Sequence, residues 1–347
     1  MHVNIKDLRD YLNRNRHYFS RLIADICKLF WWKLIRRKTA VITTGSGGIG
    51  DYLWIRSYLP LLKQYGYKVI LIAITSSKVI VEAFDRKNYD IVRFFESCIN
   101  PRRLESLPFR LFKSNVFLNF SRRSISVFVR SDIEYNDSSF DFENTFYREI
   151  NNAIFEQFQP PPIDFSHSIP VLSPPQETML LLNDKYVVLT EGGNTHGRFT
   201  DLQLQSIIHC LTNLDYKILF NGNYSRVIKI VSIQEQKSII NGGLFSFPQY
   251  TYVIKNAAFV VTVNTSIYHF AILLNTPIVI VTPYEPHTVL LNDPMQQYVF
   301  NDRESPTDNP SLRTNEEKNA LLVNTDPEEI VMAIKRMQAQ IEENHRG

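Results

Sequence analysis

Hydrophobic positions along the chain follow two alternating patterns: short β-branched runs, and longer stretches with apolar residues at helical spacing. The β-branched run that begins at Thr39 and the run at residues 68–75 both predict buried strands. Between them, a glycine cluster leads into an apolar helical pattern from Leu53 to Tyr65. The order strand, turn, helix, strand is that of a right-handed βαβ unit, which builds parallel sheets.

The rest of the first half shows the same alternation more weakly. A helix is predicted near residues 79–84, and strand-like runs occupy residues 90–95 and 124–132. The stretch between these two runs is basic, and two interpretations stay open for it. The cations form either a solvated face or a surface that holds an anionic acceptor near the glycine cluster. They are Arg102, Arg103, Arg110, Lys113, Arg122 and Arg123.

The second half repeats the α/β rhythm. Residues 185–211 contain a strand, a glycine-containing loop and an amphipathic helix, and residues 216–223 contain the next strand and its turn. A helix near residues 252–257, a strand at 258–265, a helix from Ser266 and a strand at 277–282 follow. Ligands of such sheets bind at the carboxyl ends of the strands. The residues predicted there are Asn194, Thr195, Arg198, Gly222, Asn264, Thr265 and Ser266.

A proline-rich passage at residues 159–175 separates the two halves. Its six prolines suit neither a helix nor a central strand, so the passage is interpreted as an interdomain linker. The predicted fold class is α/β, with two doubly wound, Rossmann-like domains that face each other across a cleft. The predicted parts are a basic amphipathic helical segment (1–38), two Rossmann-like domains (39–165 and 166–330), and a C-terminal helix and tail (331–347).

The glycine cluster is the first candidate site. Gly45, Gly47, Gly48 and Gly50 let backbone N–H groups approach a phosphate or a sugar, and the following helix points its positive end at the same place. Asp51 closes this turn. Its carboxylate is either the N-terminal cap of the helix or a base held over a ligand.

Charge is distributed unevenly along the 347 residues. Of 38 Lys and Arg and 35 Asp and Glu, residues 1–160 hold 25 and 16, a balance of +9, which leaves 13 and 19, or −6, for the remainder. The basic half is expected to meet an anionic partner. No zinc-finger spacing, RNP-like strand or basic helix-turn-helix pattern accompanies the charge, so an anionic lipid surface is favoured over nucleic acid.

Residues 1–38 supply a reason for a lipid surface. The segment carries ten Lys or Arg against three Asp, and its apolar residues fall at helical spacing up to Trp31 and Trp32. Its longest uncharged apolar run has four residues, too few for a spanning helix or a signal peptide. The segment is predicted either to lie on a membrane or to pack as an ordinary amphipathic helix on the domain.

The cysteine content indicates the redox environment of the protein. The three cysteines are Cys27, Cys98 and Cys210, and they are too widely separated for a disulfide framework or a metal-ligand pair. A reducing compartment fits this pattern, and no metal site and no cofactor are expected. With the N-terminal segment, it predicts a cytoplasmic protein that is peripheral on a membrane.

Three motifs in order resemble glycosyltransferase family 9, the ADP-heptose:lipopolysaccharide heptosyltransferases and their relatives. Residues 47–66 are similar to the family's opening Gly-x-x-Gly-Asp and leucine-rich helix, and EGGNTHGRF resembles its donor-loop segment. Residues 257–286 match its Ser/Thr-x-x-x-His pattern and the Ala and Pro residues that follow. The matching positions there are Thr265, His269, Ala271, Pro277, Pro283 and Pro286.

The resemblance implies a GT-B fold and an inverting, metal-independent sugar transfer. Asp51 falls on the family's proposed catalytic base, and Gly47, Gly48 and Gly50 form the acceptor-side turn. The implied partners are a nucleotide-sugar donor and an anionic glycan or glycolipid acceptor such as lipopolysaccharide core. The implied donor-binding residues are Gly193, Asn194, Thr195, Arg198, Gly222, Asn264, Thr265, Ser266 and His269. His269 equally suits a packed helix position.

The chain departs from the family at two places. Asn264 stands where aspartate is usual, and Asn223 and Ser225 stand where an acidic residue would bind a nucleotide ribose. These departures leave the donor sugar open, and they keep a non-catalytic, sugar-nucleotide-binding relative as an alternative.

A different class of protein is the second alternative. Gly45-x-Gly47-x-x-Gly50 after a strand also fits an NAD(P)-dependent oxidoreductase. However, the second strand ends in Ile74-Thr75-Ser76-Ser77, without the acidic residue that a ribose needs.

Overall fold

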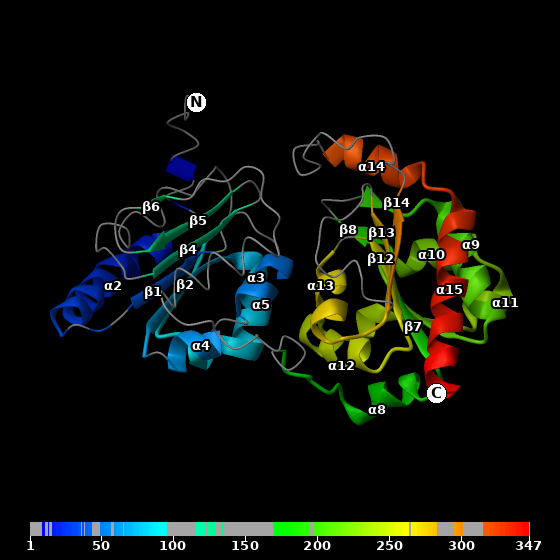
Figure 1. Cartoon of the computed structure of the whole chain (residues 1–347), viewed down its shortest axis with the longest axis horizontal. Coiled ribbons are helices and arrows are strands. Elements are labelled where there is room, and N and C mark those ends of the chain that lie inside the picture. Colours follow the sequence, from blue (N-terminus) through cyan, green and yellow to red (C-terminus); the bar gives the residue numbers. More distant parts are fainter. Residues whose placement is uncertain are drawn as a thin grey trace. The chain divides into compact units, whose positions relative to one another are not determined.

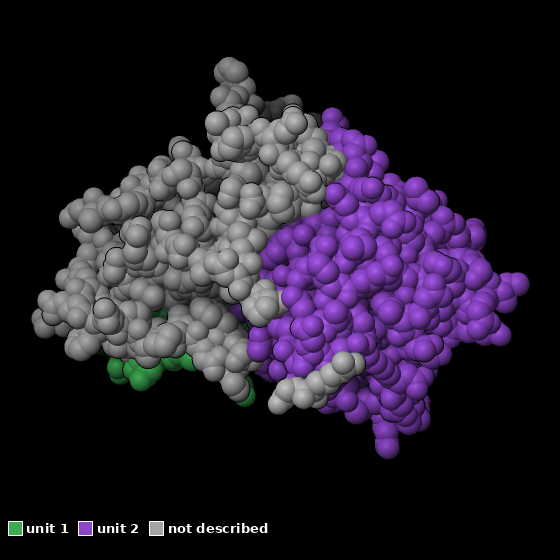
Figure 2. Space-filling view, turned by 45° about the vertical axis from the view of Figure 1, so that its right-hand side comes forward, with its two compact units in different colours: residues 1–163 green, residues 164–347 purple. Residues whose placement is uncertain are grey.

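The computed structural model describes about two thirds of the chain. The described residues are 9–10, 13, 16–35, 37, 39–43, 49–56, 59–64, 66–95, 116–121, 124–129, 133–134, 169–193, 197–263, 265–282, 295–300 and 315–346. The chain divides into two compact units, residues 1–163 and 164–347 (Figure 2). The division falls inside the proline-rich passage at residues 159–175. Each unit is built around its own six-stranded sheet (Figure 1).

The sheet of unit 1 has the order β3-β2-β1-β4-β5-β6. Its strands are β1 (Thr39–Thr43), β2 (Lys68–Ile74), β3 (Ile91–Phe95), β4 (Val116–Ser121), β5 (Ser124–Val129) and β6 (Ile133–Glu134). The first four strands are parallel, whereas β5 is antiparallel to β4 and β6 to β5. The sheet is therefore doubly wound about β1, and its edge is closed by a hairpin that the sequence pattern did not predict.

The helices of unit 1 begin with α2 (Arg16–Leu34), which contacts β3. The pattern over residues 53–65 forms two helices, α3 (Ile49–Arg56) and α4 (Leu59–Gln64), instead of the single predicted one. Pro60 is the second residue of α4, a position in the first helical turn that tolerates proline. The helical segment predicted near residues 79–84 spans α5 (Lys78–Ile80) and a π turn (Val81–Asp85), between the 3₁₀ turns Thr75–Ser77 and Arg86–Asn88.

The sheet of unit 2 has the order β11-β10-β7-β12-β13-β14, and every pairing in it is parallel. The strands are β7 (Tyr186–Thr190), β10 (Lys217–Asn221), β11 (Ile239–Asn241), β12 (Val260–Val263), β13 (Ile278–Thr282) and β14 (Gln296–Phe300). All residues of β7, β12 and β13 are buried. A parallel strand that is covered on both faces needs apolar residues at successive positions, which explains the continuous apolar sequence of these three strands.

Helices cover both faces of this sheet (Figure 1). The longer ones, α9 (Asp201–Asn213) and α15 (Pro327–Arg346), contact each other on one face, and α13 (Ser266–Leu273) and α12 (Tyr250–Lys255) lie on the other. The remaining helices are α8 (Gln176–Met179), α10 (Tyr224–Ile230), α11 (Ile233–Gln236) and α14 (Asn315–Val323), with 3₁₀ turns at Leu180–Leu182, Gly242–Leu244 and Phe247–Gln249.

The C-terminal helix α15 is part of the core of unit 2. It begins at Pro327, and its apolar stripe enters the same buried cluster as β7, β12 and α9. The stripe consists of Ile330, Ala333, Ile334, Met337 and Ile341. The C-terminal segment expected separately at 331–347 is thus packed into unit 2. Among the described residues, no helix has the length and apolar character needed to cross a membrane.

Candidate functional site

The carboxyl edge of the unit 2 sheet gathers most of the described donor-site candidates. The chain builds β7, β10 and β11 toward one side and then returns to build β12, β13 and β14 toward the other, so β7 and β12 flank the topological switch point. Open α/β sheets bind ligands at this place. Arg198 lies in the hairpin after β7, Gly222 directly follows β10, and Thr265 and Ser266 follow β12.

A short hairpin leaves the end of β7 and carries the donor-loop candidates. It pairs β8 (Gly192–Gly193) with β9 (Gly197–Arg198), and β8 contacts β12 across the switch point. Gly197 has φ +87°, a left-handed conformation that a side chain strains. Arg198 is exposed on the second strand. The predicted residues Asn194 and Thr195 lie outside the described residues.

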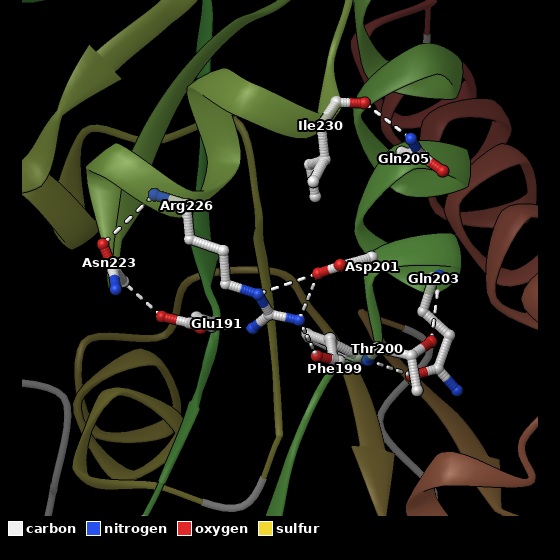
Figure 3. A network of polar contacts seen from close by, with 9 residues as sticks. All are labelled: Glu191, Phe199, Thr200, Asp201, Gln203, Gln205, Asn223, Arg226 and Ile230. Carbon is white, nitrogen blue, oxygen red and sulfur yellow. Dashed lines mark hydrogen bonds and ion pairs between the residues drawn. The ribbon is translucent and has the colours of Figure 1, made fainter.

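The base of this hairpin is held by Glu191, which is 4% exposed. Its backbone accepts a hydrogen bond from the amide of Phe199 (2.9 Å), which closes the hairpin. Its carboxylate accepts one from the amide of Asn223 (2.6 Å) and pairs with the guanidinium of Arg226. Figure 3 shows Arg226 reaching from α10 to this position.

Arg226 also contacts the other end of the hairpin. Its guanidinium donates to the carbonyl of Phe199 (3.1 Å) and to the carboxylate of Asp201 (2.8 Å), the first residue of α9 (Figure 3). Burial lowers the pKa of Arg226, but the hydrogen bonds that its guanidinium donates to Glu191 and Asp201 outweigh this effect and raise the pKa above its usual value. One cation therefore fixes both ends of the segment that holds the donor-loop candidates.

Glu191 is a residue that sequence reasoning missed. A Cβ atom on Gly222 would lie 2.5 Å from the Cβ atom of Glu191, so only glycine fits beside it. The sequence offers no acidic residue after Asn221, where the family binds a ribose, yet Glu191 brings a carboxylate to that strand end from the neighbouring strand. The sequence does contain a signal for Glu191, which is an acidic residue directly after an apolar strand. Such a carboxylate needs a partner, because burial of an unpaired charge costs free energy.

Two threonines, Thr262 and Thr265, lie at the other strand end of the switch point, that of β12. Thr265 is the N-cap of α13, and its hydroxyl accepts a hydrogen bond from the amide of Ile267 (3.2 Å). The hydroxyl of Thr262, at the end of β12, lies 3.2 Å from that of Thr265. Ser266 is the first residue of α13, so its position lies at the positive end of the helix. Asn264, between these residues, lies outside the described part of the chain.

His269 lies one turn into α13. Its side chain is half-buried, and its ring centroid is 4.9 Å from that of the buried Tyr268. It thus belongs to the same helix end as Thr265, while part of its surface packs against a neighbouring ring. Both interpretations of His269, as a donor contact and as a packed helix residue, agree with this position.

On unit 1 the structure bears on the two interpretations of Asp51, as the N-terminal cap of a helix or as a base held over a ligand. Helix α3 begins at Ile49, so Asp51 is its third residue and not the residue before the helix. The interpretation of Asp51 as the N-cap is therefore wrong, since an N-cap residue precedes the first helical residue. An acidic residue in the first turn still interacts favourably with the helix dipole. Gly50 is buried in the same turn, whereas Gly47 and Gly48 lie outside the described residues.

A buried polar cluster holds α3 in place. The guanidinium of Arg56 donates to both carboxylate oxygens of Asp85 (2.7 and 2.9 Å), and the phenol of Tyr52 donates to the same group (2.8 Å). The hydroxyls of Tyr52 and Tyr89 are 3.1 Å apart. Burial, together with Tyr89 and Asp85, raises the pKa of Tyr52 well above its usual value, so the phenol stays protonated. The helix that carries Asp51 is thus anchored to residues 85–89.

No group of three or more His, Cys, Asp or Glu side chains suited to a metal ion occurs among the residues that the structure describes. The described residues of the carboxyl edge of unit 2 offer the guanidinium of Arg198 and the backbone amides at the start of α13, whereas the guanidinium of Arg226 is paired with Glu191 and Asp201. Together with hydroxyl groups, these are groups that bind phosphates.

The arrangement of two doubly wound units defines the α/β class expected for a GT-B fold. Among solved structures, the chain is similar to the glycosyl transferase family 9 protein of Veillonella parvula DSM 2008, with 11% identity over 87% of this chain and 98% of that one, and a TM-score of 0.59. It is also similar to the E. coli ADP-heptose lps heptosyltransferase II, with 12% identity over 88% of this chain and 99% of that one, and a TM-score of 0.52.

At the level of sequence, no protein-family model and no curated protein matches the chain. The resemblance to glycosyltransferase family 9 that the three motifs carry is confirmed as a shared fold.

Proposed function

We propose that this protein is a glycosyltransferase that moves a sugar, a heptose or another, from a nucleoside-diphosphate donor to a bacterial surface glycan. The observation that supports the proposal most is the carboxyl edge of the unit 2 sheet. Arg198, Gly222 and Thr265 follow three neighbouring strands there, at the switch point where such sheets bind nucleotides. The fold shared with a heptosyltransferase agrees with a donor of this kind.

In this proposal unit 2 binds the donor. The start of α13 offers backbone amides and the hydroxyl of Ser266 to the diphosphate, and Arg198 offers a charge-assisted hydrogen bond. The carboxylate of Glu191 uses both oxygens within the protein, one for Arg226 and one for the amide of Asn223. Glu191 is therefore assigned to shaping the site and not to the ribose, and the nucleoside is assigned to Asn223 and to the donor-loop candidates Gly193, Asn194 and Thr195.

Asp51 is the proposed catalytic base. Its carboxylate takes the proton of the acceptor hydroxyl, whose oxygen attacks the anomeric carbon from the face opposite the leaving nucleoside diphosphate, so the configuration inverts. Arg198, Thr265 and the amides of α13 stabilise the charge that develops on the leaving group. The transfer is then independent of a divalent metal, and a chelator such as EDTA is expected to leave the turnover unchanged.

The proposed acceptor is an anionic glycan or glycolipid such as lipopolysaccharide core. The charge of +9 in residues 1–160 supports an anionic partner on the side of unit 1. Acceptors of this kind are carried on a membrane, so the proposed location is the cytoplasm, peripherally on the inner face of the bacterial cytoplasmic membrane.

The decisive experiment is a donor screen with the full-length protein. ADP-, GDP-, UDP- and CMP-sugars are tested for thermal stabilisation, and a ligand at 100 times its dissociation constant adds about 2.7 kcal/mol to the free energy of unfolding. Release of nucleoside diphosphate with an acceptor glycan present is then measured for the donor that binds. Binding without turnover would instead support a non-catalytic sugar-nucleotide-binding protein, and stabilisation by NAD(P) alone would support an oxidoreductase.

A further inference from the structure

Helix α2 has two apolar faces, and only one of them is covered. Leu29 and Trp32 are buried against unit 1, with Trp32 only 6% exposed. Trp31, the neighbour of Trp32 in sequence, is 57% exposed. Phe30, Leu34 and Ile35 are also exposed. These four residues, Phe30, Trp31, Leu34 and Ile35, are called the outer patch below.

The inner face is attached to the sheet by polar contacts as well. The guanidinium of Arg93, on β3, donates to both carboxylate oxygens of Asp25 (2.6 Å each), and Asp25 is buried. The ammonium group of Lys28 donates to the carbonyl of Asp90 (3.3 Å) and lies 5.0 Å from the ring centroid of Trp32. These contacts hold α2 on β3, so the outer patch belongs to a helix that is fixed to unit 1.

The charges of α2 are sorted between its faces. Asp25 is the only acidic residue between Arg16 and Leu34, and it is turned inward to Arg93. Arg16 is exposed at the start of the helix, and Arg37 is exposed just beyond its end. Arg21 and Lys28 are exposed as well, but both interact electrostatically with Asp25, so they flank the inner face. The outer patch therefore lies between the exposed cations Arg16 and Arg37, and the only carboxylate of the helix is turned away from it.

We propose that the outer patch is a docking surface for an anionic lipid bilayer, and that α2 remains attached to unit 1 while it docks. Tryptophan and phenylalanine prefer the interfacial region of a membrane, and lysine and arginine beside them attract anionic headgroups. The complementary charge selects lipid over an uncharged apolar partner. Only Trp31 is offered to the membrane in this arrangement, because Trp32 attaches the helix to the rest of unit 1.

This inference specifies the membrane partner of the proposed function, and its test measures lipid binding without any donor or acceptor. Vesicles of phosphatidylglycerol and vesicles of phosphatidylcholine are mixed with the full-length protein, and the bound fraction is measured by sedimentation. Trp31→Ser is expected to weaken binding to phosphatidylglycerol about tenfold, since it removes a large apolar side chain from the interface. Binding to phosphatidylcholine is expected to be much weaker, and added salt is expected to weaken binding to phosphatidylglycerol.

A matched control distinguishes binding through the outer patch from nonspecific hydrophobic binding. Ile233, on unit 2, is 78% exposed, and Ile233→Ser is expected to leave vesicle binding unchanged. Trp31→Phe is expected to keep the binding and to lose the blue shift of tryptophan emission on adding vesicles. Equal binding by the wild type, Trp31→Ser and Ile233→Ser would overturn the proposal. A dimer in lipid-free solution that Trp31→Ser dissociates, with vesicle binding unchanged, would assign the patch to a second copy and would also overturn it.

Discussion

Arg226 forms an ion pair with Glu191 although 35 positions separate them in the chain. Glu191 directly follows the buried strand β7, and Arg226 lies in α10, the helix that follows β10. Because the same guanidinium reaches the carbonyl of Phe199, the pair joins both ends of the hairpin that holds the donor-loop candidates. We infer that Arg226 positions this hairpin without contacting the donor itself.

Arg226→Gln is expected to reduce the free energy of unfolding by about 1–3 kcal/mol, because it leaves the buried carboxylate of Glu191 without its cation. The Michaelis constant for the donor is expected to rise several-fold, while that for the acceptor stays near the wild-type value. Chemical denaturation and donor titrations measure the two effects. A rise in both Michaelis constants would show a general loss of structure instead.

The double variant Glu191→Gln with Arg226→Gln is the matched control for this pair. It removes the carboxylate together with its partner, so part of the lost stability is expected to return. A coupling free energy of about 0.5–3 kcal/mol between the two positions is expected from a double-mutant cycle. Simple additivity of the two single substitutions would contradict a direct pair.

Asp51→Asn separates chemistry from helix stability. Asparagine cannot accept the proton of the acceptor, so kcat is expected to fall about 100- to 10,000-fold with the donor affinity intact. The loss of one negative charge in the first turn of α3 is expected to cost only about 0.3–1 kcal/mol of stability. The measurements are kcat, the melting temperature and the donor dissociation constant.

Glu328→Gln is the control for this substitution. Glu328 lies exposed in the first turn of α15, so the change removes the same charge from a comparable helix position in unit 2. Its turnover is expected to match the wild type. If Asp51→Asn also retained its turnover, Asp51 would be structural, and the base would have to be another acidic residue.

Arg198→Ala tests the phosphate contact. If the exposed guanidinium binds the donor diphosphate, its removal is expected to weaken donor affinity by about 1.5–3 kcal/mol, the value of a hydrogen bond to a charged group. Calorimetric titration with the donor selected by the screen measures the loss. Lys229→Ala, which removes an exposed cation from α10 in the same unit, is expected to change the affinity little. Equal affinities of both variants would place Arg198 outside the donor site.

Asp85→Asn tests the anchor of α3. Arg56 and Asp85 are both almost fully buried, so replacing the carboxylate removes the charge that accepts two hydrogen bonds from the buried guanidinium. The free energy of unfolding is expected to fall by about 3–5 kcal/mol. Glu82→Gln is the control: Glu82 pairs with Lys78 at 3.7 Å on the surface, and both side chains are half exposed. Its loss is expected to cost less than about 0.5 kcal/mol, so similar losses from both variants would contradict a buried anchor.

The sequence by itself determined the fold class and most of the elements. The apolar runs of β7, β12 and β13 are long, β-branched and uninterrupted, and a pattern of this kind depends only on local residue order. The same holds for the strand ends, so the positions of Arg198, Gly222 and Thr265 at one sheet edge could be predicted. Strand β4 and the antiparallel hairpin with β5 could not, because a short strand in a basic stretch shows no clear period.

Only the tertiary structure decided which partners these residues have. Glu191 and Arg226 belong to different βα connections, and no local pattern relates them, whereas the parallel pairing of β7 with β10 brings their strand ends together. Likewise, Trp31 and Trp32 are equivalent in the sequence, and the rotation of about 100° per helical residue places one outward and the other on unit 1. The physical reason is that the sequence specifies the period of each element, whereas burial depends on what packs against it.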